Sequence, residues 1–318
     1  MRLVLLASGA FAEPTMRWLA MSEHEIALVV TQPARGSGRG RHPTPTPVKT
    51  LADALRLPVV EVEDINTTDF VERVSSLGVR LMLAIAFGQK LAPEFIAATP
   101  GGAINLHASL LPKYRGAAPI NWAITRGESE SGCTVFYIVK RMDAGPILAQ
   151  SALSIGPEET AGELHDRLAE LGVRTVQNAL ALFADEVNPP GSPQDEGQVT
   201  LAPKLKKSDG FINFAQPLRR IIDHIRGMTP WPGATARYVA ASGREEVVTI
   251  TRARPDPGGL SPSAHDTPPG SMDGRLLIAA EDGFLQTVEI KPASGRTMCW
   301  ADFINGRHVS PGDRFEDV

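Results

Sequence analysis

The chain lacks the features that mark several large classes of protein. It has only 2 cysteines, Cys133 and Cys299, which stand too far apart to form a metal-binding or redox spacing. No His-x-x-x-His or Cys-x-x-Cys occurs, so we expect no metal. No apolar run approaches the roughly 20 residues that cross a bilayer, and the run Leu3–Ala7 is too short for a signal peptide. We therefore expect a protein of the reducing cytoplasm that does not contact a membrane.

An excess of charge of one sign is also missing. The formal net charge is −4, with 42% hydrophobic and 21% charged residues, which is typical of a globular protein. This balance excludes a general basic coat for nucleic-acid binding, although local basic patches are compatible with it. The length of 318 residues exceeds the usual size of one hydrophobic core, so we expect two domains.

The first part of the sequence alternates short apolar runs with amphipathic segments. Strands are expected at 3–7, 26–31, 59–62, 81–86 and 103–106, and helices near 13–21, 47–56, 67–77 and 91–98. This alternation indicates βαβ units, and therefore an α/β fold with a Rossmann-like, mostly parallel sheet. The loop after the first strand holds Gly9 but no Gly-x-Gly-x-x-Gly, so the dinucleotide fingerprint is absent.

A smaller β-barrel is predicted after a linker. One long helix is expected over 160–184, where Gly172 costs about 1 kcal/mol relative to alanine and permits a break. The stretch 188–197 is rich in proline and glycine, as linkers are. The short β-rich runs that follow suit an OB-like barrel, and a rigid turn at 229–233 is expected to bury Trp231. We predict a first domain at 1–188, a linker at 189–206 and a barrel domain at 207–318.

Polar side chains gather where the fifth expected strand ends. Asn105 and His107 are two residues apart, so both point to the same side of an extended chain, and Ser109 continues the alternation. A further strand, Thr134–Val139, is followed by Asp143. Ligands bind at the carboxyl ends of strands in open α/β sheets, and an amide, an imidazole and a carboxylate suit acyl transfer. The alternative is that His107 only satisfies a loop carbonyl.

Basic residues cluster in two places. The loop 31–49 contains no acidic residue and carries four basic ones: Arg35, Arg39, Arg41 and Lys49. Three more open the second part of the chain: Lys204, Lys206 and Lys207. Such side chains can bind phosphates with release of counterions. A solvated flexible loop is the alternative for the first cluster.

Several longer motifs carry a resemblance to a known family. They are Thr31-Gln32-Pro33 with Gly38-Arg39-Gly40 and Pro45-Thr46-Pro47-Val48-Lys49, then Asn105-x-His107-x-Ser109-Leu110-Leu111-Pro112-x-Tyr114-Arg115-Gly116-Ala117-Ala118-Pro119-Ile120, Met142-Asp143-x-Gly145, Ala202-Pro203-Lys204-Leu205, Pro230-Trp231-Pro232-Gly233-Ala234 and Pro311-Gly312-Asp313-Arg314. With these, the chain resembles the family of methionyl-tRNA formyltransferases over essentially its full length. The central motif is common to formyltransferases in general, whereas the arginine loop together with the barrel points to the tRNA enzymes.

The resemblance implies a function and a set of site residues. It implies formyl transfer from 10-formyltetrahydrofolate to the α-amino group of initiator methionyl-tRNA, in the cytoplasm and by a monomer. The implied residues are Asn105, His107 and Asp143 for catalysis; Phe87, Gly88, Ser109, Leu110, Leu111 and Pro112 for the folate; and the two basic clusters for the tRNA, with Arg39 entering the acceptor stem. For Ser109 and Arg115, a structural role in the loop is at least as compatible with the sequence.

The chemistry of the three catalytic candidates agrees with that assignment. When an amine adds to a formyl carbon, negative charge builds on the former carbonyl oxygen, where Asn105 and a protonated His107 can each donate a hydrogen bond. Losing one such donor costs about 2.7–4 kcal/mol of transition-state stabilisation. Asp143 either favours the imidazolium or accepts a proton from the incoming ammonium through water. Two rival functions stay open: an amino-sugar N-formyltransferase and a non-catalytic tRNA-binding protein.

Overall fold

The structure is a computed structural model that describes residues 1–37, 42–256 and 267–318. By its internal contacts the chain divides into two compact units. Unit 1 comprises residues 1–119, 131–153 and 165–202, and unit 2 comprises residues 120–130, 154–164 and 203–318. Residues 189–202 of the predicted linker belong to unit 1, and residues 203–206 belong to unit 2. The predicted domain boundaries at 188 and 207 stay predictions.

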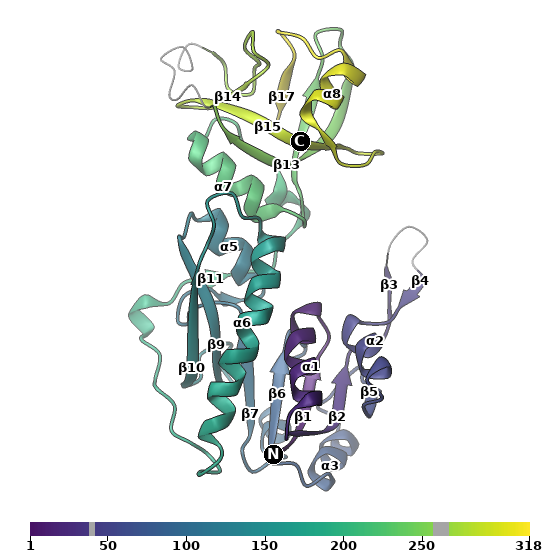
Figure 1. Cartoon of the computed structure of the whole chain (residues 1–318), viewed down its shortest axis with the longest axis vertical. Coiled ribbons are helices and arrows are strands. Elements are labelled where there is room, and N and C mark those ends of the chain that lie inside the picture. Colours follow the sequence, from purple (N-terminus) through teal and green to yellow (C-terminus); the bar gives the residue numbers. More distant parts are fainter. Residues whose placement is uncertain (38–41, 257–266) are drawn as a thin grey trace. The chain divides into compact units, whose positions relative to one another are not determined.

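Unit 1 is built on a 7-stranded sheet (Figure 1). In order across the sheet the strands are β10 (Ile147–Ser154), β9 (Glu130–Tyr137), β7 (Ala103–His107), β6 (Leu81–Ile85), β1 (Arg2–Ala7), β2 (Glu25–Thr31) and β5 (Val59–Glu61). The pairs from β7 to β5 are parallel, whereas β9 runs antiparallel to β7. The α/β class and the mostly parallel sheet predicted from the sequence are confirmed.

Apolar strands buried on both faces explain why this sheet lies at the centre of unit 1. All five residues of Leu3–Ala7 have an exposed fraction of 0%, as expected for a parallel strand covered by helices on both faces. The helices of unit 1 are η1 (Ala10–Ala12), α1 (Glu13–Met21), α2 (Pro47–Ala54), α3 (Thr68–Ser76), α4 (Pro93–Ile96), most of α6 (Ala161–Leu182) and η2 (Glu196–Gln198). Phe70 of α3 and Phe95 of α4 pack into one cluster with Val4 and Leu6 of β1.

Helix α6 is continuous, so the break that Gly172 permitted does not occur. A β-carbon at position 172 would lie 2.8 Å from Cδ2 of the buried Leu106. The glycine therefore lets the helix approach strand β7 closely, and this packing outweighs the low helix propensity of glycine.

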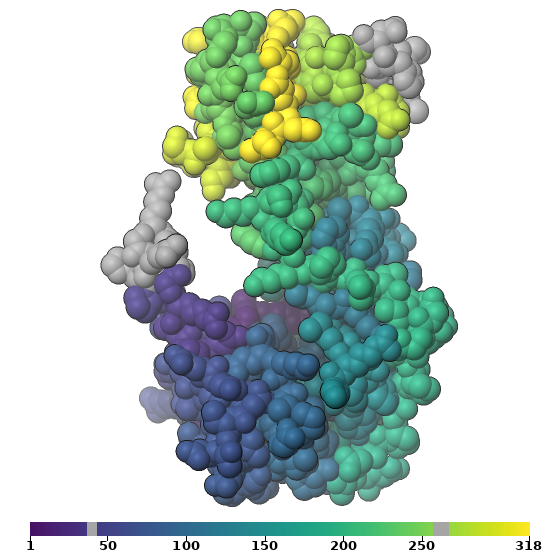
Figure 2. Space-filling view, turned by 180° about the vertical axis from the view of Figure 1, so that it is seen from behind, coloured from purple at the N-terminus to yellow at the C-terminus, as the bar shows by residue number. Residues whose placement is uncertain are grey.

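A short hairpin interrupts the loop between β2 and α2. Strands β3 (Arg35–Ser37) and β4 (His42–Thr44) pair antiparallel, and Figures 1 and 2 show them standing out from the rest of unit 1 beside α2. Thr46 then caps α2, since its hydroxyl accepts a hydrogen bond of 3.1 Å from the Lys49 amide. Residues 38–41, which include the candidates Arg39 and Arg41, lie outside the described residues.

Unit 2 contains an antiparallel barrel. Its strands are β14 (Ile278–Ala279), β15 (Phe284–Pro292), β13 (Glu245–Pro255), β12 (Ala234–Val239) and β17 (Arg314–Glu316) in this order, with β16 (Met298–Cys299) beside β15. Gly270 closes the ring, because its carbonyl accepts from the Phe315 amide of β17 and its amide donates to the Ala279 carbonyl of β14, both at 2.8 Å. The predicted OB-like barrel is confirmed. Unit 2 also holds α5 (Pro119–Thr125), η3 (Lys207–Gly210), α7 (Leu218–Met228) and α8 (Trp300–Arg307).

The prediction that the turn at 229–233 buries its aromatic residue is wrong. Trp231 has an exposed fraction of 53%. The backbone of the turn packs closely on its neighbours, since a β-carbon at Gly162 would lie 2.9 Å from Pro230 and one at Gly210 would overlap the Gly233 carbonyl oxygen. In the part of the chain that the structure describes, no helix has the length and apolar character needed to span a membrane.

Candidate active site

The carboxyl ends of β1, β2 and β6 meet at one edge of the parallel sheet of unit 1. There the Phe87 carbonyl accepts hydrogen bonds from the Ser8 hydroxyl at 3.2 Å and from the Gln32 amide at 2.7 Å. Gly88 has a φ of 81°, and a β-carbon on it would lie 2.5 Å from the Gln32 amide nitrogen. Phe87 is 4% exposed and belongs to the core cluster of unit 1.

Strand β7 brings Asn105 and His107 to the same side, as their spacing predicts. His107 is 7% exposed, and its Nε2 donates a hydrogen bond of 2.9 Å to the Tyr114 carbonyl. The ring also packs edge-on against Phe136, with 6.4 Å between the centroids. Because a carbonyl only accepts, Nε2 carries the proton and Nδ1 is the nitrogen left for chemistry. Asn105 is half-buried, and its side chain has no hydrogen-bond partner among the described residues.

The loop after β7 is held in place by its own hydrogen bonds. The Ser109 hydroxyl, 1% exposed, donates to the Lys113 carbonyl at 2.7 Å. The Leu111 amide donates to the Thr134 hydroxyl at 3.1 Å. Ser109 and Leu111 are thus occupied within the fold, whereas Leu110 and Pro112 are half-buried.

Asp143 reaches the site by a route different from the one predicted. Strand β9 is antiparallel to β7, so its carboxyl end lies beside the start of β7, where the Ile138 amide donates to the Ala103 carbonyl at 2.8 Å. Asp143 therefore follows the end of a buried strand, as the sequence predicts, but this strand end and the carboxyl end of β7 lie at opposite edges of the sheet. The loop between β9 and β10 instead turns back, and Oδ2 of Asp143 accepts a hydrogen bond of 2.8 Å from the Gly116 amide.

One short backbone segment therefore binds two of the catalytic candidates. In the segment Tyr114–Gly116, the Tyr114 carbonyl accepts a hydrogen bond from the His107 ring, and the Gly116 amide donates one to the Asp143 carboxylate. Asn105 lies two residues before His107, on the same side of β7. The arrangement offers an amide donor, an imidazole nitrogen and a carboxylate from two elements that converge on this segment.

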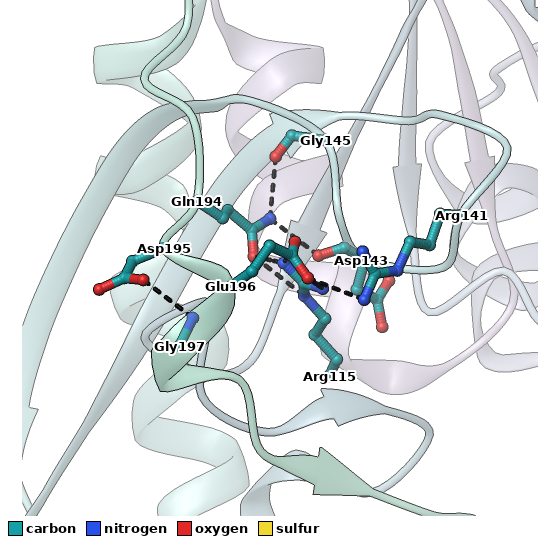
Figure 3. A network of polar contacts seen from close by, with 8 residues as sticks. All are labelled: Arg115, Arg141, Asp143, Gly145, Gln194, Asp195, Glu196 and Gly197. Atoms are coloured by element: carbon teal, nitrogen blue, oxygen red, sulfur yellow. Dashed lines mark hydrogen bonds and ion pairs between the residues drawn. The ribbon is translucent and has the colours of Figure 1, made fainter.

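The residues that hold Arg115 have no recognisable pattern in the sequence. This guanidinium, 4% exposed, donates to Gln194 at 2.7 and 3.0 Å and to Glu196 at 2.9 Å (Figure 3). Hydrogen bonds from Arg115 also hold the pKa of Glu196 below its usual value. The bracing role considered for Arg115 thus agrees with its position. Gln194 and Glu196 were not recognised because they lie in a stretch whose composition resembles a linker.

The basic candidates are divided between the two units. In unit 1, Arg35 is exposed on β3 and Lys49 forms an ion pair with Asp53 on α2. In unit 2, Lys204, Lys206 and Lys207 are exposed, and none of them forms an ion pair with a described residue. Among the described residues, no group of three or more His, Cys, Asp or Glu side chains is arranged to hold a metal ion.

Two solved structures illustrate which known folds this chain resembles. HypX from Aquifex aeolicus in complex with tetrahydrofolic acid superimposes with a TM-score of 0.64 at 17% identity, over 98% of this chain and 48% of that one. WlaRD, a sugar 3N-formyl transferase, superimposes with a TM-score of 0.63 at 16% identity, over 93% of this chain and 99% of that one. At these identities the likeness concerns the fold alone.

Sequence comparison is more specific. Residues 1–180 match the family described as Formyl transferase, and residues 204–308 match Formyl transferase, C-terminal domain. The methionyl-tRNA formyltransferase of Heliobacterium modesticaldum is 39% identical over 328 residues, which cover 99% of this chain and 100% of that protein. The methionyl-tRNA formyltransferase of Solibacter usitatus is 40% identical over 317 residues, which cover 99% of this chain and 98% of that protein. This chain therefore belongs to the methionyl-tRNA formyltransferase family.

Proposed function

We propose that this protein transfers the formyl group of 10-formyltetrahydrofolate to the α-amino group of methionine on initiator methionyl-tRNA. The observation that carries the proposal is the convergence of His107 and Asp143 on Tyr114–Gly116, with Asn105 on the same side of β7 as His107. Membership of the family supplies the substrates, and a folate-bound protein of the same fold agrees with the donor.

The three side chains have distinct tasks in this reaction. The amine nitrogen forms a bond to the formyl carbon, and the bond from that carbon to the donor nitrogen then breaks. Negative charge develops on the formyl oxygen, where the Asn105 amide donates a hydrogen bond. Since Nε2 of His107 is bound to the Tyr114 carbonyl, Nδ1 is the atom that donates to this oxygen when the ring is protonated. Asp143 accepts the proton released by the amine, directly or through water, and passes it towards the leaving nitrogen.

The proposed ligand contacts follow the surroundings of each residue. The folate is bound by the backbone at Gly88 and by the side chains of Leu110 and Pro112, which are half-buried. Phe87, Ser109 and Leu111 support this pocket from within the fold. The tRNA is bound by the two basic clusters: Arg35, Arg39, Arg41 and Lys49, and Lys204, Lys206 and Lys207. The cytoplasmic location and the monomeric state expected from the sequence stay predictions.

Replacing His107 tests the proposed chemistry. We expect His107→Ala to lower kcat for formyl-methionyl-tRNA formation by roughly 10²–10³-fold, the loss typical for one oxyanion donor. Folate binding, measured by calorimetry, should change little because the ring contacts the Tyr114 carbonyl rather than the loop at Gly88. The matched control is His165→Ala on α6, whose ring packs on Phe11 at 5.4 Å and should leave kcat unchanged.

Supplying two alternative acceptors separates the rival functions. Wild-type protein is incubated with 10-formyltetrahydrofolate and either methionyl-tRNA or a nucleotide-linked amino sugar. Formylation of the sugar alone would show that the protein is an amino-sugar N-formyltransferase that uses the same site. If neither acceptor is formylated but the protein still binds tRNA, it is a non-catalytic tRNA-binding protein. Near-normal turnover by His107→Ala would remove that residue from the mechanism.

A further inference from the structure

The segment that looked like a linker lies along the loop that carries Asp143. We call residues 189–196 the connecting segment. At its start, the Tyr137 hydroxyl donates to the Pro189 carbonyl at 2.8 Å. Further on, Ser192 and Ile147 exchange two backbone hydrogen bonds, both 2.8 Å long. Since Tyr137 and Ile147 are the two ends of the β9–β10 loop, the connecting segment is attached to both sides of this loop.

The approach between the two segments is close enough to require a glycine. A β-carbon at Gly191 would lie 2.7 Å from Cβ of Pro146 and 3.1 Å from the Ile147 carbonyl oxygen. A flexible tether would need no such contact. The proline and glycine content of the segment therefore serves packing against the loop as well as the change of chain direction.

Gln194 is at the centre of these contacts. Its amide nitrogen donates to the Asp143 carbonyl and to the Gly145 carbonyl, both at 2.8 Å. Its amide oxygen accepts two hydrogen bonds from Arg115. Figure 3 shows the side chain between the Arg115 guanidinium and the backbone of the Asp143 loop. Every hydrogen-bonding atom of this amide is occupied, which fixes the orientation of the group.

Glu196 completes the network from the other side. Its carboxylate binds Arg115 at 2.9 Å and Arg141 at 2.8 Å (Figure 3). Arg141 belongs to the β9–β10 loop, so this loop is bound to the connecting segment through a side chain as well as through its backbone. Arg115 precedes Gly116, whose amide holds the Asp143 carboxylate. The connecting segment thus contacts the supports of Asp143 on two sides.

We propose that Gln194 is a positioning residue for Asp143, and that the connecting segment is thereby part of the active site. This inference rests on the proposed function. Asp143 has a φ of 50°, a conformation that non-glycine residues rarely adopt and that persists only where neighbours impose it. Gln194 holds the Asp143 carbonyl on one side while Gly116 holds its carboxylate on the other. Without the amide donors of Gln194, the loop relaxes and the carboxylate leaves its place beside Tyr114–Gly116.

Two substitutions separate the two halves of the Gln194 side chain. Gln194→Ala removes every contact, whereas Gln194→Glu keeps an acceptor for Arg115 and loses the donors to Asp143 and Gly145. We expect both to lower kcat by about 10–10²-fold, the effect of displacing a catalytic group by about 1 Å. KM for the folate should be unchanged. The matched control is Gln198→Ala, whose exposed amide donates only to Asp195 and which should keep the wild-type kcat.

A double-mutant cycle then shows whether Gln194 acts through Asp143. In an Asp143→Asn background, Gln194→Ala should cost no further activity, because the group that it positions is already lost. Additive losses would overturn the inference, as would a Gln194→Glu variant with full kcat. A drop in melting temperature that tracks the loss of kcat in both variants would also overturn it, because it would indicate a purely structural role. If Asp143→Asn alone is fully active, the proposed function of Asp143 fails, and that outcome is distinct from a silent Gln194.

Discussion

Two glycines beside Asp143 allow backbone segments to approach more closely than other residues permit. A β-carbon at Gly145 would overlap the Tyr137 carbonyl oxygen, and one at Gly116 would overlap the Ala202 carbonyl oxygen. Gly116 also has a φ of 130°, which L-residues rarely adopt. Both positions belong to the network that holds Asp143, so their requirement for glycine is a requirement of the site.

Gly145→Ala should therefore damage the site through the backbone. We expect a destabilisation of at least about 1–3 kcal/mol, the usual cost of overpacking, together with a large loss of kcat as the loop shifts. Chemical denaturation and single-turnover formylation measure the two effects. The control is Gly306→Ala on α8, where a β-carbon meets nothing within 4 Å and the better helix propensity should stabilise slightly. Wild-type behaviour of Gly145→Ala would contradict the close approach.

At the scale of single residues, the sequence predicted directions better than contacts. The alternation in β7 was enough to place Asn105 and His107 on the same side, because strand geometry has a period of 2. The alternative for His107, a hydrogen bond to a loop carbonyl, is the bond that the structure shows, and Tyr114, seven residues further on, supplies it. That Phe87 belongs to the core had no local signal, because its neighbours there are distant in sequence. Trp231 shows the same limit, because the rigid turn forms as expected while its indole stays exposed.

The long helix α6 begins with a capping box. The Thr160 hydroxyl accepts from the Glu163 amide at 3.3 Å, and the Glu163 carboxylate accepts from the Thr160 amide at 2.8 Å. Arg252 adds a hydrogen bond of 2.7 Å to the same carboxylate. The pKa of Glu163 is lowered, chiefly by the bond from the Thr160 backbone, against the opposing effect of burial.

Thr160→Ala should cost about 1 kcal/mol of stability, as the loss of an N-cap side chain does. A carboxylate whose folded pKa is depressed stabilises fully above its unfolded value of 4.5 and less as the pH falls through the folded value. Thr160→Ala keeps the backbone bond that lowers this pKa most and removes only the smaller contribution of the Thr160 hydroxyl, which donates to the same carboxylate at 2.8 Å. The difference between Thr160→Ala and wild type should therefore shrink only slightly from neutral pH to about pH 3.5. Thermal melts at both pH values measure it. Thr67→Ala is the control, because this N-cap threonine of α3 makes no capping bond, and an equal loss there would contradict the assignment.

At the scale of elements, positions were predictable but the direction of pairing was not. The apolar runs located β1, β2, β5, β6 and β7 to within one or two residues. The antiparallel sense of β9 could not be read, because a buried run looks the same in either direction. Neither strand β10 nor the packing of the connecting segment has a local signal in the sequence. Ser192 of this segment pairs with Ile147, which lies more than forty residues earlier in the chain.

For the whole molecule, the net charge of −4 conceals local basic surface. Lys206 and Lys207 are exposed at η3, free of ion pairs with described residues, although acidic residues outnumber basic ones in the chain. The two-part organisation was predictable from length and from the change in composition. The exchange of segments between the units was not, because residues 120–130 and 154–164 belong to unit 2 only through contacts with distant sequence.

Removing the two lysines should weaken tRNA use without touching the folate. For Lys206→Ala with Lys207→Ala, we expect a higher KM for methionyl-tRNA and an unchanged KM for 10-formyltetrahydrofolate. The dependence of log affinity for tRNA on log salt concentration should become shallower by about 2, roughly 1 for each lost phosphate contact. Lys291→Ala with Arg296→Ala removes the same charge from exposed positions of unit 2 and should leave that slope intact. If both double variants show the same salt dependence, the lysines act only through the general electrostatic field of the protein. If the slope changes only for Lys206→Ala with Lys207→Ala, these two lysines contact the tRNA backbone directly.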